Sequence, residues 1–286
     1  MSKNNNKMVD LGFHLSIAHS MSNAPIEART KGYGVFQLFV SSSRSWHVKT
    51  ISKEEVLSFK QASESFKDKI FTHAPYLANP SSPDHLSREK SVNQLIGNAK
   101  NCEQIGIRYM VVHMGSHLGK GINEGISNLS KSISSIITAT SSVVVLLENS
   151  AGYTNSVGSK MSEIGEALAA VDNKRIGVCI DTCHAFAAGY NIATLEGTKK
   201  LMEEVKEHIG INKVALVHFN DAKFECGSGL DRHWHIGKGR IGIAGFKNFF
   251  RQNTLTTSSY IMETPINEDG DNDYNFKAAM SILSEY

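Results

Sequence analysis

The chain has 286 residues, of which 30 are Lys or Arg and 28 are Asp or Glu, so its formal net charge is +2. Hydrophobic residues make up 41% of the chain and charged residues 20%, with only 5 prolines. This composition excludes a disordered, collagen-like or low-complexity chain, and the charge balance permits nucleic-acid binding without arguing for it.

The start of the chain and its cysteines bear on the cellular compartment. Residues 1–7 are polar and rich in Asn and Lys, without the apolar core of a secretion signal. The longest apolar runs fall far short of the ~20 residues that span a membrane. Only 4 cysteines occur and none form a C-x-x-C pair, which argues against a zinc ribbon and fits a reducing compartment. We therefore expect an intracellular protein, cytoplasmic or nuclear, with a disordered extension over residues 1–8.

Eight short apolar runs have the character of buried parallel strands. They span residues 9–15, 35–40, 69–74, 109–115, 143–150, 176–181, 214–221 and 260–264. Segments with helical character lie between these runs and after the last one, at residues 23–31, 53–66, 86–105, 122–139, 161–171, 194–209, 246–252 and 274–283. Strand and helix alternate throughout, which predicts a parallel sheet with crossover helices. Eight such units in one chain favour an α/β fold, a single (β/α)8 TIM barrel over residues 9–286.

Six of the expected strands end on an imidazole or a carboxylate. In chain order, these residues are His73, His113, Glu148, Asp181, His218 and Glu263. In a (β/α)8 barrel the carboxyl ends of all strands surround one mouth, where active sites are found. A lone His after a strand is more often a hydrogen-bonded rim residue than a ligand. Burying three carboxylates beside several imidazoles is nevertheless costly without a counter-charge, so the joint pattern predicts bound cations, zinc or manganese rather than magnesium.

Further polar residues follow the sixth and seventh strands. His184 comes three residues after Asp181, and the long segment 222–244 contains Asp231 and His233. If the segment is extended there, Asp231 and His233 can reach one metal together. Residues 237–242 also fit the pattern G-x-G-x-x-G, but a dinucleotide site is not expected because no apolar strand runs directly into Gly237. A tight turn is the better interpretation of these glycines.

Three stretches of the sequence resemble the endonuclease IV family of apurinic/apyrimidinic (AP) endonucleases of DNA base-excision repair. They are residues 177–184 (GVCIDTCH), 218–223 (HFNDAK) and 231–239 (DRHWHIGKG). The stretches occur in the family's order and rough spacing, and the resemblance extends from residues 12–16 (GFHLS) to 263–265 (ETP). The family's fold is a (β/α)8 barrel, in agreement with the strand count.

The resemblance implies a trinuclear zinc site, with Mn²⁺ as an alternative at one position. All nine ligand positions of the family carry the expected residue types. The resemblance assigns them to three metals, in the groups His73, His113 and the bridging Glu148; Asp181, His218 and Glu263; and His184, Asp231 and His233.

The family hydrolyses the phosphodiester 5′ to an abasic site and leaves a 3′-hydroxyl and a 5′-deoxyribose phosphate; trimming of 3′ ends is a side activity. The resemblance implies that a hydroxide shared by two metals attacks the phosphorus and that Glu148 orients it. This chemistry is physically sound, because metal binding lowers the pKa of water from 15.7 to about 7. The third metal would stabilise the leaving oxygen.

The family also flips the damaged nucleotide out of double-stranded DNA and fills the gap with loop side chains. Arg44, Tyr76 and Leu77 occupy those positions in this chain. The sequence departs from the family in two loops that face DNA. Residues 18–20 (AHS) stand where Gly-Gly is common, and Ser45 replaces a longer polar residue.

Two other functions remain open at this stage. A metal-dependent sugar isomerase or epimerase on the same barrel would also place Glu, Asp and His at strand ends, but it has no need of Asp231, His233 or the wedge residues. A module that only binds abasic DNA would be expected to have lost ligands, and none is lost. Access of DNA to a single barrel mouth suits a monomer.

Overall fold

Eight parallel strands close into a barrel in the order β1-β10-β7-β6-β5-β4-β3-β2. The computed structural model describes residues 9–257, 259–268 and 270–286, so the expected extension over residues 1–8 lies outside the described part. The barrel strands are β1 Asp10–His14, β2 Val35–Leu38, β3 Ile70–His73, β4 Tyr109–His113, β5 Val144–Glu148, β6 Ile176–Asp181, β7 Val214–His218 and β10 Ser259–Met262. Each begins within one residue of an expected apolar run, and the predicted TIM barrel is confirmed.

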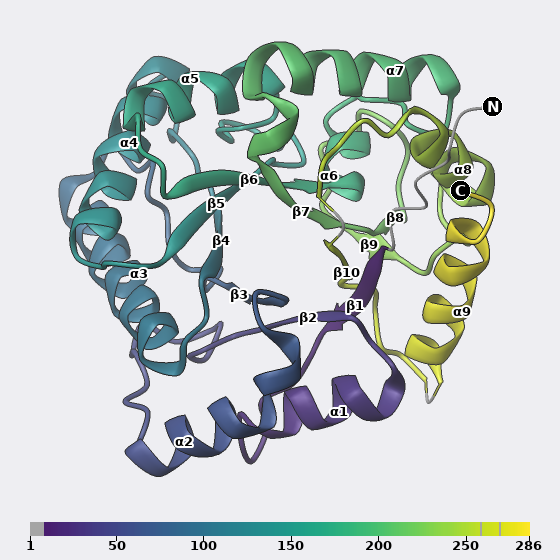
Figure 1. The fold of residues 1–286 in the computed structure, drawn as a ribbon. Helices are drawn as coiled ribbons and strands as arrows, with labels where there is room; N and C mark the ends of the chain where they lie inside the picture. Colours follow the sequence, from purple (N-terminus) through teal and green to yellow (C-terminus); the bar gives the residue numbers. More distant parts are fainter. Residues whose placement is uncertain (1–8, 258, 269) are drawn as a thin grey trace.

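Helices surround the barrel on its outside, apart from α6 (Thr182–Ala187), which lies at one end of it (Figure 1). They are α1 Asn23–Lys31, α2 Lys53–Ala62, α3 His85–Ile105, α4 Ile122–Thr138, α5 Met161–Val171, α6 Thr182–Ala187, α7 Leu195–Glu204, α8 Gly242–Gln252 and α9 Asp271–Leu283. Two 3-10 turns, η1 Glu64–Phe66 and η3 Ile211–Lys213, and one π-helical turn, η2 Val205–Ile209, complete the ring. Among the described helices, none combines the length and the hydrophobicity needed to cross a membrane.

Three of the expected elements are divided in the structure. The expected helices 53–66 and 194–209 each divide, into α2 with η1 and into α7 with η2. The expected strand 214–221 ends at His218, because the Asn220 N–H donates to Thr182 Oγ1 (2.9 Å) instead of continuing the ladder. Asp221–Ala222 then forms strand β8, which pairs antiparallel with β9, His233–Trp234.

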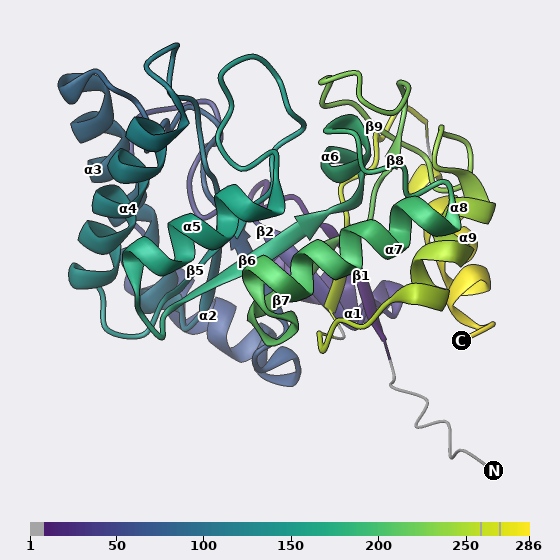
Figure 2. The same cartoon turned by 90° about the horizontal axis from the view of Figure 1, so that it is seen from above.

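Helix α6 begins directly at the end of strand β6 and was not expected. The Asp181 side chain accepts a hydrogen bond from the His184 N–H (2.7 Å) and thereby caps the helix. A strand that ends on such a residue needs no loop before the next helix. As a result, α6 lies with β8 and β9 at one end of the barrel, on the side where the strands finish (Figure 2).

The inside of the barrel has an apolar layer below a polar layer. Seven strands supply the buried apolar side chains of the apolar layer, β5 with two and the others with one each: Val35, Phe71, Val111, Val144, Leu146, Cys179, Leu216 and Ile261. Because side chains alternate between the faces of a strand, the residue two positions later also faces inward, nearer the carboxyl end. That second position is polar in all eight strands: His14, Gln37, His73, His113, Glu148, Asp181, His218 and Glu263. Strand periodicity therefore builds a ring of polar side chains around the mouth.

Candidate metal centre

Nine side chains at the mouth form three groups whose ligand atoms lie within 4.8 Å of one another. The groups are His73, His113 and Glu148; Glu148, Asp181, His218 and Glu263; and His184, Asp231 and His233. Glu148 belongs to the first two. These are all of the residues that the family resemblance assigns to three metals, and the structure brings every one of them together.

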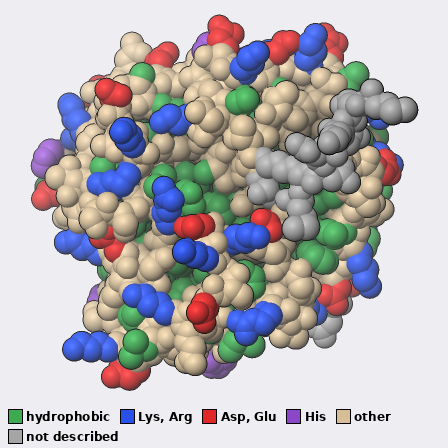
Figure 3. All heavy atoms as spheres, viewed as in Figure 1, with side chains coloured by type: hydrophobic (Ala, Val, Ile, Leu, Met, Phe, Trp, Pro, Cys, Tyr) green, Lys and Arg blue, Asp and Glu red, His purple; other side chains and the backbone are tan. Residues whose placement is uncertain are grey.

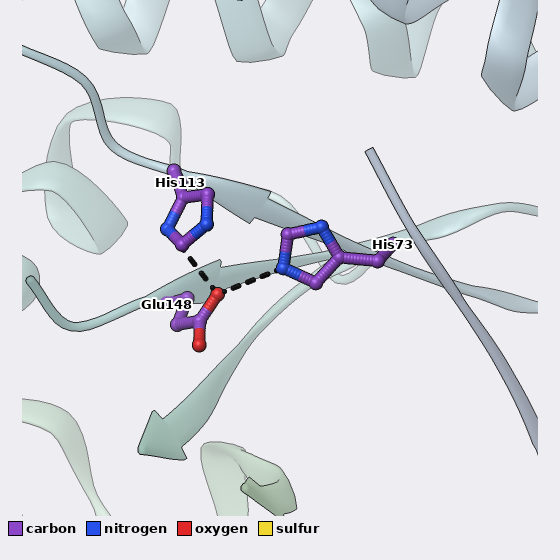
Figure 4. A group of neighbouring side chains, drawn as sticks. All are labelled: His73, His113 and Glu148. Carbon is purple, nitrogen blue, oxygen red and sulfur yellow. Dashed lines mark hydrogen bonds and ion pairs between the residues drawn. The ribbon is translucent and has the colours of Figure 1, made fainter. Parts of the chain in front are cut away.

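Glu148 lies between the first and second groups at the end of β5, fully buried. Its Oε2 is 3.1 Å from His73 Nε2 and 3.3 Å from His113 Nδ1 (Figure 4). Its Oε1 is 2.7 Å from His218 Nδ1. One carboxylate thus contacts imidazoles from three different strands, which is the geometry of a bridging ligand.

The second group holds three carboxylates around one imidazole. His218 Nδ1 lies 3.2 Å from Glu263 Oε2 and 3.9 Å from Asp181 Oδ2, in addition to its contact with Glu148. Asp181 and Glu148 are fully buried, and the Glu263 side chain is only 11% exposed. Three ionised carboxylates in so small a volume repel one another strongly, and a cation among them removes that repulsion.

The third group is the most open and comes from the segments after β6 and β7. Asp231 Oδ1 lies 3.1 Å from His184 Nε2 and 3.4 Å from His233 Nε2. The other nitrogens face backbone carbonyls: His184 Nδ1 is 2.9 Å from Asn149 O, and His233 Nδ1 is 3.1 Å from Glu263 O. The Nδ1–H groups therefore donate outward, and both Nε2 lone pairs face Asp231.

The two Nε2 atoms of the third group provide a test of whether a metal fits. Both are buried, and neither forms a hydrogen bond within the described part of the chain, although Asp231 is close to each. Nitrogens that converge on a carboxylate without hydrogen-bond geometry are arranged as ligands to a shared cation. The residues of this group therefore fit a divalent metal.

Burial and neighbouring charges shift the pKa values of the site in both directions. Burial lowers the pKa of His184 and of His218, but carboxylates beside each imidazole raise it above its usual value. Burial raises the pKa of Glu148, but the neighbouring His113 and His218 lower it well below its usual range, so it stays ionised. Burial lowers the pKa of His113 to about 4 and keeps its imidazole neutral, as metal binding requires. Burial also raises the pKa of the Cys179 thiol to about 12, which favours the neutral thiol over the thiolate that binds zinc.

Asp221 holds the long segment after β7 in place. Its fully buried carboxylate accepts hydrogen bonds from the N–H groups of Gly237 (2.9 Å), Gly239 (3.0 Å) and Ile241 (3.0 Å). A Cβ atom on Gly239 would lie 2.4 Å from Asp221 Oδ1. Gly239 therefore permits a close approach of backbone to carboxylate, and these glycines form a turn that fixes the segment carrying Asp231 and His233.

Sequence reasoning missed the buried amides behind the ligands. Asn220 Nδ2 donates to Asp181 Oδ2 (2.7 Å), and Asn220 Oδ1 accepts from the Glu263 N–H (2.7 Å). Gln37 and His14 complete the polar ring from β2 and β1. The sequence did contain a signal for Gln37 and His14, because each is a polar residue on the inward face of a barrel strand.

The expected DNA-contacting residues lie around the mouth, outside the three ligand groups. Arg44 is exposed on the segment after β2. Tyr76 and Leu77 are 58% and 39% exposed, and the Tyr76 ring lies 5.5 Å from the rings of both His73 and His113. They line a pocket of about 260 Å³ together with Tyr153, another residue that the sequence did not single out.

The first departure from the family has a structural consequence. His19 has φ 69°, in the left-handed region that favours glycine. The backbone after β1 thus keeps a conformation that suits the family's glycine pair while carrying an exposed imidazole. The second departure, Ser45, contributes its backbone carbonyl, which accepts a hydrogen bond from Gln94 Nε2 (2.6 Å).

The chain is similar to known proteins over most of its length. A family model described as a xylose isomerase-like TIM barrel matches residues 26–286. The probable endonuclease 4 of Cenarchaeum symbiosum is 40% identical over 278 residues, covering 96% of this chain and 99% of that protein. The apurinic-apyrimidinic endonuclease 1 of Plasmodium falciparum is 37% identical over 262 residues, covering 90% of this chain and 44% of that protein.

A solved structure agrees with these relatives. The crystal structure of endonuclease IV from Thermus thermophilus matches with a TM-score of 0.86 at 32% identity, over 97% of this chain and 100% of that chain. The barrel by itself does not distinguish a nuclease from a sugar isomerase, since the family model is named after xylose isomerase. The sequence identity does, and the chain therefore belongs to the endonuclease IV family of DNA-repair nucleases.

Proposed function

We propose that the protein is a zinc-dependent AP endonuclease of base-excision repair. It hydrolyses the phosphodiester 5′ to an abasic site in double-stranded DNA and leaves a 3′-hydroxyl and a 5′-deoxyribose phosphate. Three metals are bound. The first is held by His73, His113 and Glu148, the second by Glu148, Asp181, His218 and Glu263, and the third by His184, Asp231 and His233. Mn²⁺ is an alternative to zinc at one of them. Trimming of 3′ ends uses the same site.

One observation carries this proposal: three adjacent ligand groups are linked through buried residues and open to solvent on one side. Glu148 joins the first two groups, and His233 Nε2 lies 3.4 Å from Asp181 Oδ2, which joins the second and third. The Asp231 side chain is 48% exposed, so the open side lies at the third group. A phosphodiester that enters from solvent would meet this group first.

Bound divalent cations supply Lewis-acid stabilisation of phosphate charge and lower the pKa of water, which allows hydrolysis without a protein nucleophile. The chain's own contribution centres on Glu148. The neighbouring His113 and His218 keep the Glu148 carboxylate ionised, so that it would hold two metals and orient the attacking water between them. Asn220 fixes the Asp181 carboxylate through Oδ2, which limits the motion of this ligand during the reaction.

The side chains around the mouth bind DNA in this proposal. Tyr76 and Leu77 project into solvent beside the ligands and enter the gap left by the flipped nucleotide. The pocket of about 260 Å³ between Leu77 and Tyr153 receives the extruded sugar next to His113 and Asp231. Arg44, on the segment after β2, is the third side chain that fills this gap.

The experiment uses an end-labelled duplex with a single tetrahydrofuran residue as the abasic analogue. This analogue cannot undergo β-elimination, so a product with a 3′-hydroxyl reports hydrolysis. We expect cleavage 5′ to the analogue by the metal-loaded protein, no cleavage after preincubation with EDTA, and recovery on adding Zn²⁺. An otherwise identical intact duplex serves as the control substrate.

The opposite outcome is equally informative. If protein shown to contain metal leaves the tetrahydrofuran duplex intact, the nuclease assignment fails, and a sugar isomerase or epimerase becomes the leading function. In that case the metal-loaded protein should interconvert small ketoses and aldoses, which a coupled assay would detect.

A further inference from the structure

Gln37 is the only amide in the ring of eight polar side chains around the mouth, and it is fully buried. It lies on β2, where Val35 two positions earlier belongs to the apolar layer. None of the three ligand groups includes Gln37. Its position in the ring nevertheless places it next to residues that do belong to them.

The Gln37 amide forms hydrogen bonds with three neighbours through both of its N–H donors and its oxygen. Its Oε1 lies 3.0 Å from His218 Nε2. Its Nε2 donates to Glu263 Oε1 (2.6 Å) and to His14 Nδ1 (2.9 Å). If the amide were rotated by 180°, its oxygen would lie against the Glu263 carboxylate, and two acceptors would repel each other there. One orientation is therefore fixed.

This orientation determines the tautomer of His218. An amide oxygen accepts a hydrogen bond, so His218 carries its proton on Nε2 and donates it to Gln37. Nδ1 is then the nitrogen left to bind a cation, and it faces Glu148, Glu263 and Asp181 at 2.7–3.9 Å. An imidazole whose Nε2–H is held by an amide oxygen and whose Nδ1 lies in a cluster of carboxylates is oriented to bind a divalent cation through Nδ1.

Gln37 also holds the other side of the same ligand group. The hydrogen bond from its Nε2 occupies Glu263 Oε1, which leaves Oε2 nearest His218 Nδ1, at 3.2 Å. One side chain thus orients an imidazole from β7 and a carboxylate at the end of β10. Strands β7 and β10 are neighbours in the barrel, and β1 separates β10 from β2, which carries Gln37.

We propose that Gln37 is a positioning residue for the second metal, selecting the His218 tautomer and the Glu263 carboxylate oxygen that bind it. The proposal rests on the proposed metal function of the site. It assigns to β2 a role in metal retention, although β2 supplies none of the nine ligands.

The test measures metal retention and does not depend on DNA cleavage. Q37L removes the amide with little change in size, and Q94L is the matched control. Gln94 is also buried, but it donates to the Ser45 carbonyl (2.6 Å) and not to a ligand. Each zinc-loaded protein is titrated with a competing chelator, and the zinc that remains is counted by mass spectrometry.

We expect Q37L to lose one zinc at about 10–100-fold lower chelator concentration than wild type, with Q94L like wild type. Q37E should not rescue retention, because its second oxygen faces Glu263. Equal zinc retention by Q37L and wild type would overturn the role of Gln37 but not the metal centre. A wild-type protein that retains no zinc would overturn the metal centre itself, and with it this proposal.

A measurement on the wild type protects the test against misfolding of the variants. In ¹⁵N-histidine NMR spectra of the zinc-loaded protein, His218 should be protonated at Nε2, with Nδ1 shifted by the metal. Protonation at Nδ1 would contradict the proposal, whatever the variants do.

Discussion

At the end of the barrel where the strands begin, polar side chains satisfy one another, whereas at the end where they finish, they converge on a shared space. Figure 3 views the first end, where Lys and Arg side chains are interspersed with Asp and Glu. There Lys69 Nζ pairs with Asp10 Oδ1 at 2.8 Å. At the mouth, His184 Nε2 and His233 Nε2 form no hydrogen bond with any described group.

The difference teaches how the fold separates stability from function. Arg175, beside the start of β6, donates to the carbonyls of Ile137, Thr140 and Val143 and so closes the turn between α4 and β5. Such groups need nothing from outside the chain. At the mouth, by contrast, carboxylates lie close together and imidazole nitrogens lack hydrogen bonds with the described residues, an arrangement that a bound cation would stabilise. Five predictions test this contrast.

The largest effect should come from Glu148→Gln at the mouth. Losing the charge of the bridging carboxylate should lower single-turnover cleavage by about 10³-fold, while the circular dichroism spectrum stays that of wild type. Near-normal turnover by a metal-loaded variant would show that Glu148 is not essential to the reaction.

At the opposite end, Arg175→Met should lower the free energy of unfolding by about 2–3 kcal/mol, because several carbonyls lose a charged donor. Urea denaturation measures this loss, and Lys174→Met, at an exposed neighbour, is the control. The rate of cleavage by the folded variant should not change. A specific loss of activity would mean that the two ends are coupled.

Replacing Tyr76 and Leu77 together by alanine should reduce the preference for abasic over intact duplex by about 10-fold, because stacking in the gap is lost. Competition binding measures this preference. Leu57→Ala, which removes a 69% exposed side chain from α2, should leave it unchanged. If the double variant discriminates like wild type, these residues do not form the wedge.

Glu103 provides a pH test away from the mouth. Burial raises its pKa, but N–H groups of Ser142 and Ser141 donate to its carboxylate (2.6 Å each) and lower the pKa to about 2. A depressed pKa contributes stability above the unfolded value near 4.5 and loses it as the pH falls toward 2.

Glu103→Gln should therefore lower the free energy of unfolding by about 1 kcal/mol at neutral pH, after allowing for solvent screening. The difference in the free energy of unfolding between variant and wild type should disappear as the pH falls from 4.5 to 2. Glu166→Gln, at an exposed position on α5, is the control. A gap that is independent of pH would contradict the charge-based explanation.

The smallest effect is expected at His19, whose φ of 69° suits glycine. His19→Gly should raise the free energy of unfolding by about 0.5 kcal/mol, since the relief of backbone strain exceeds the extra entropy lost on folding. Ala18→Gly, at the exposed neighbour, should instead lower it. Thermal melts of both variants measure these changes, and a lower melting temperature for His19→Gly would contradict the prediction.

The sequence by itself determined the barrel and the polar residues that share its mouth. Apolar runs mark buried strands, and polar residues at their ends, from His73 to Glu263, must share one mouth because parallel strands finish at the same end. Neither conclusion needs long-range detail, since each follows from local hydrophobicity and strand direction.

Only the tertiary structure decided how these residues meet. It showed that Glu148 contacts His73, His113 and His218, that Asn220 fixes Asp181, and that Gln37 faces His218. It also divided the expected strand 214–221 and placed α6 directly after β6. Hydrogen-bond partners far apart in sequence depend on barrel register and side-chain packing, which local pattern does not contain.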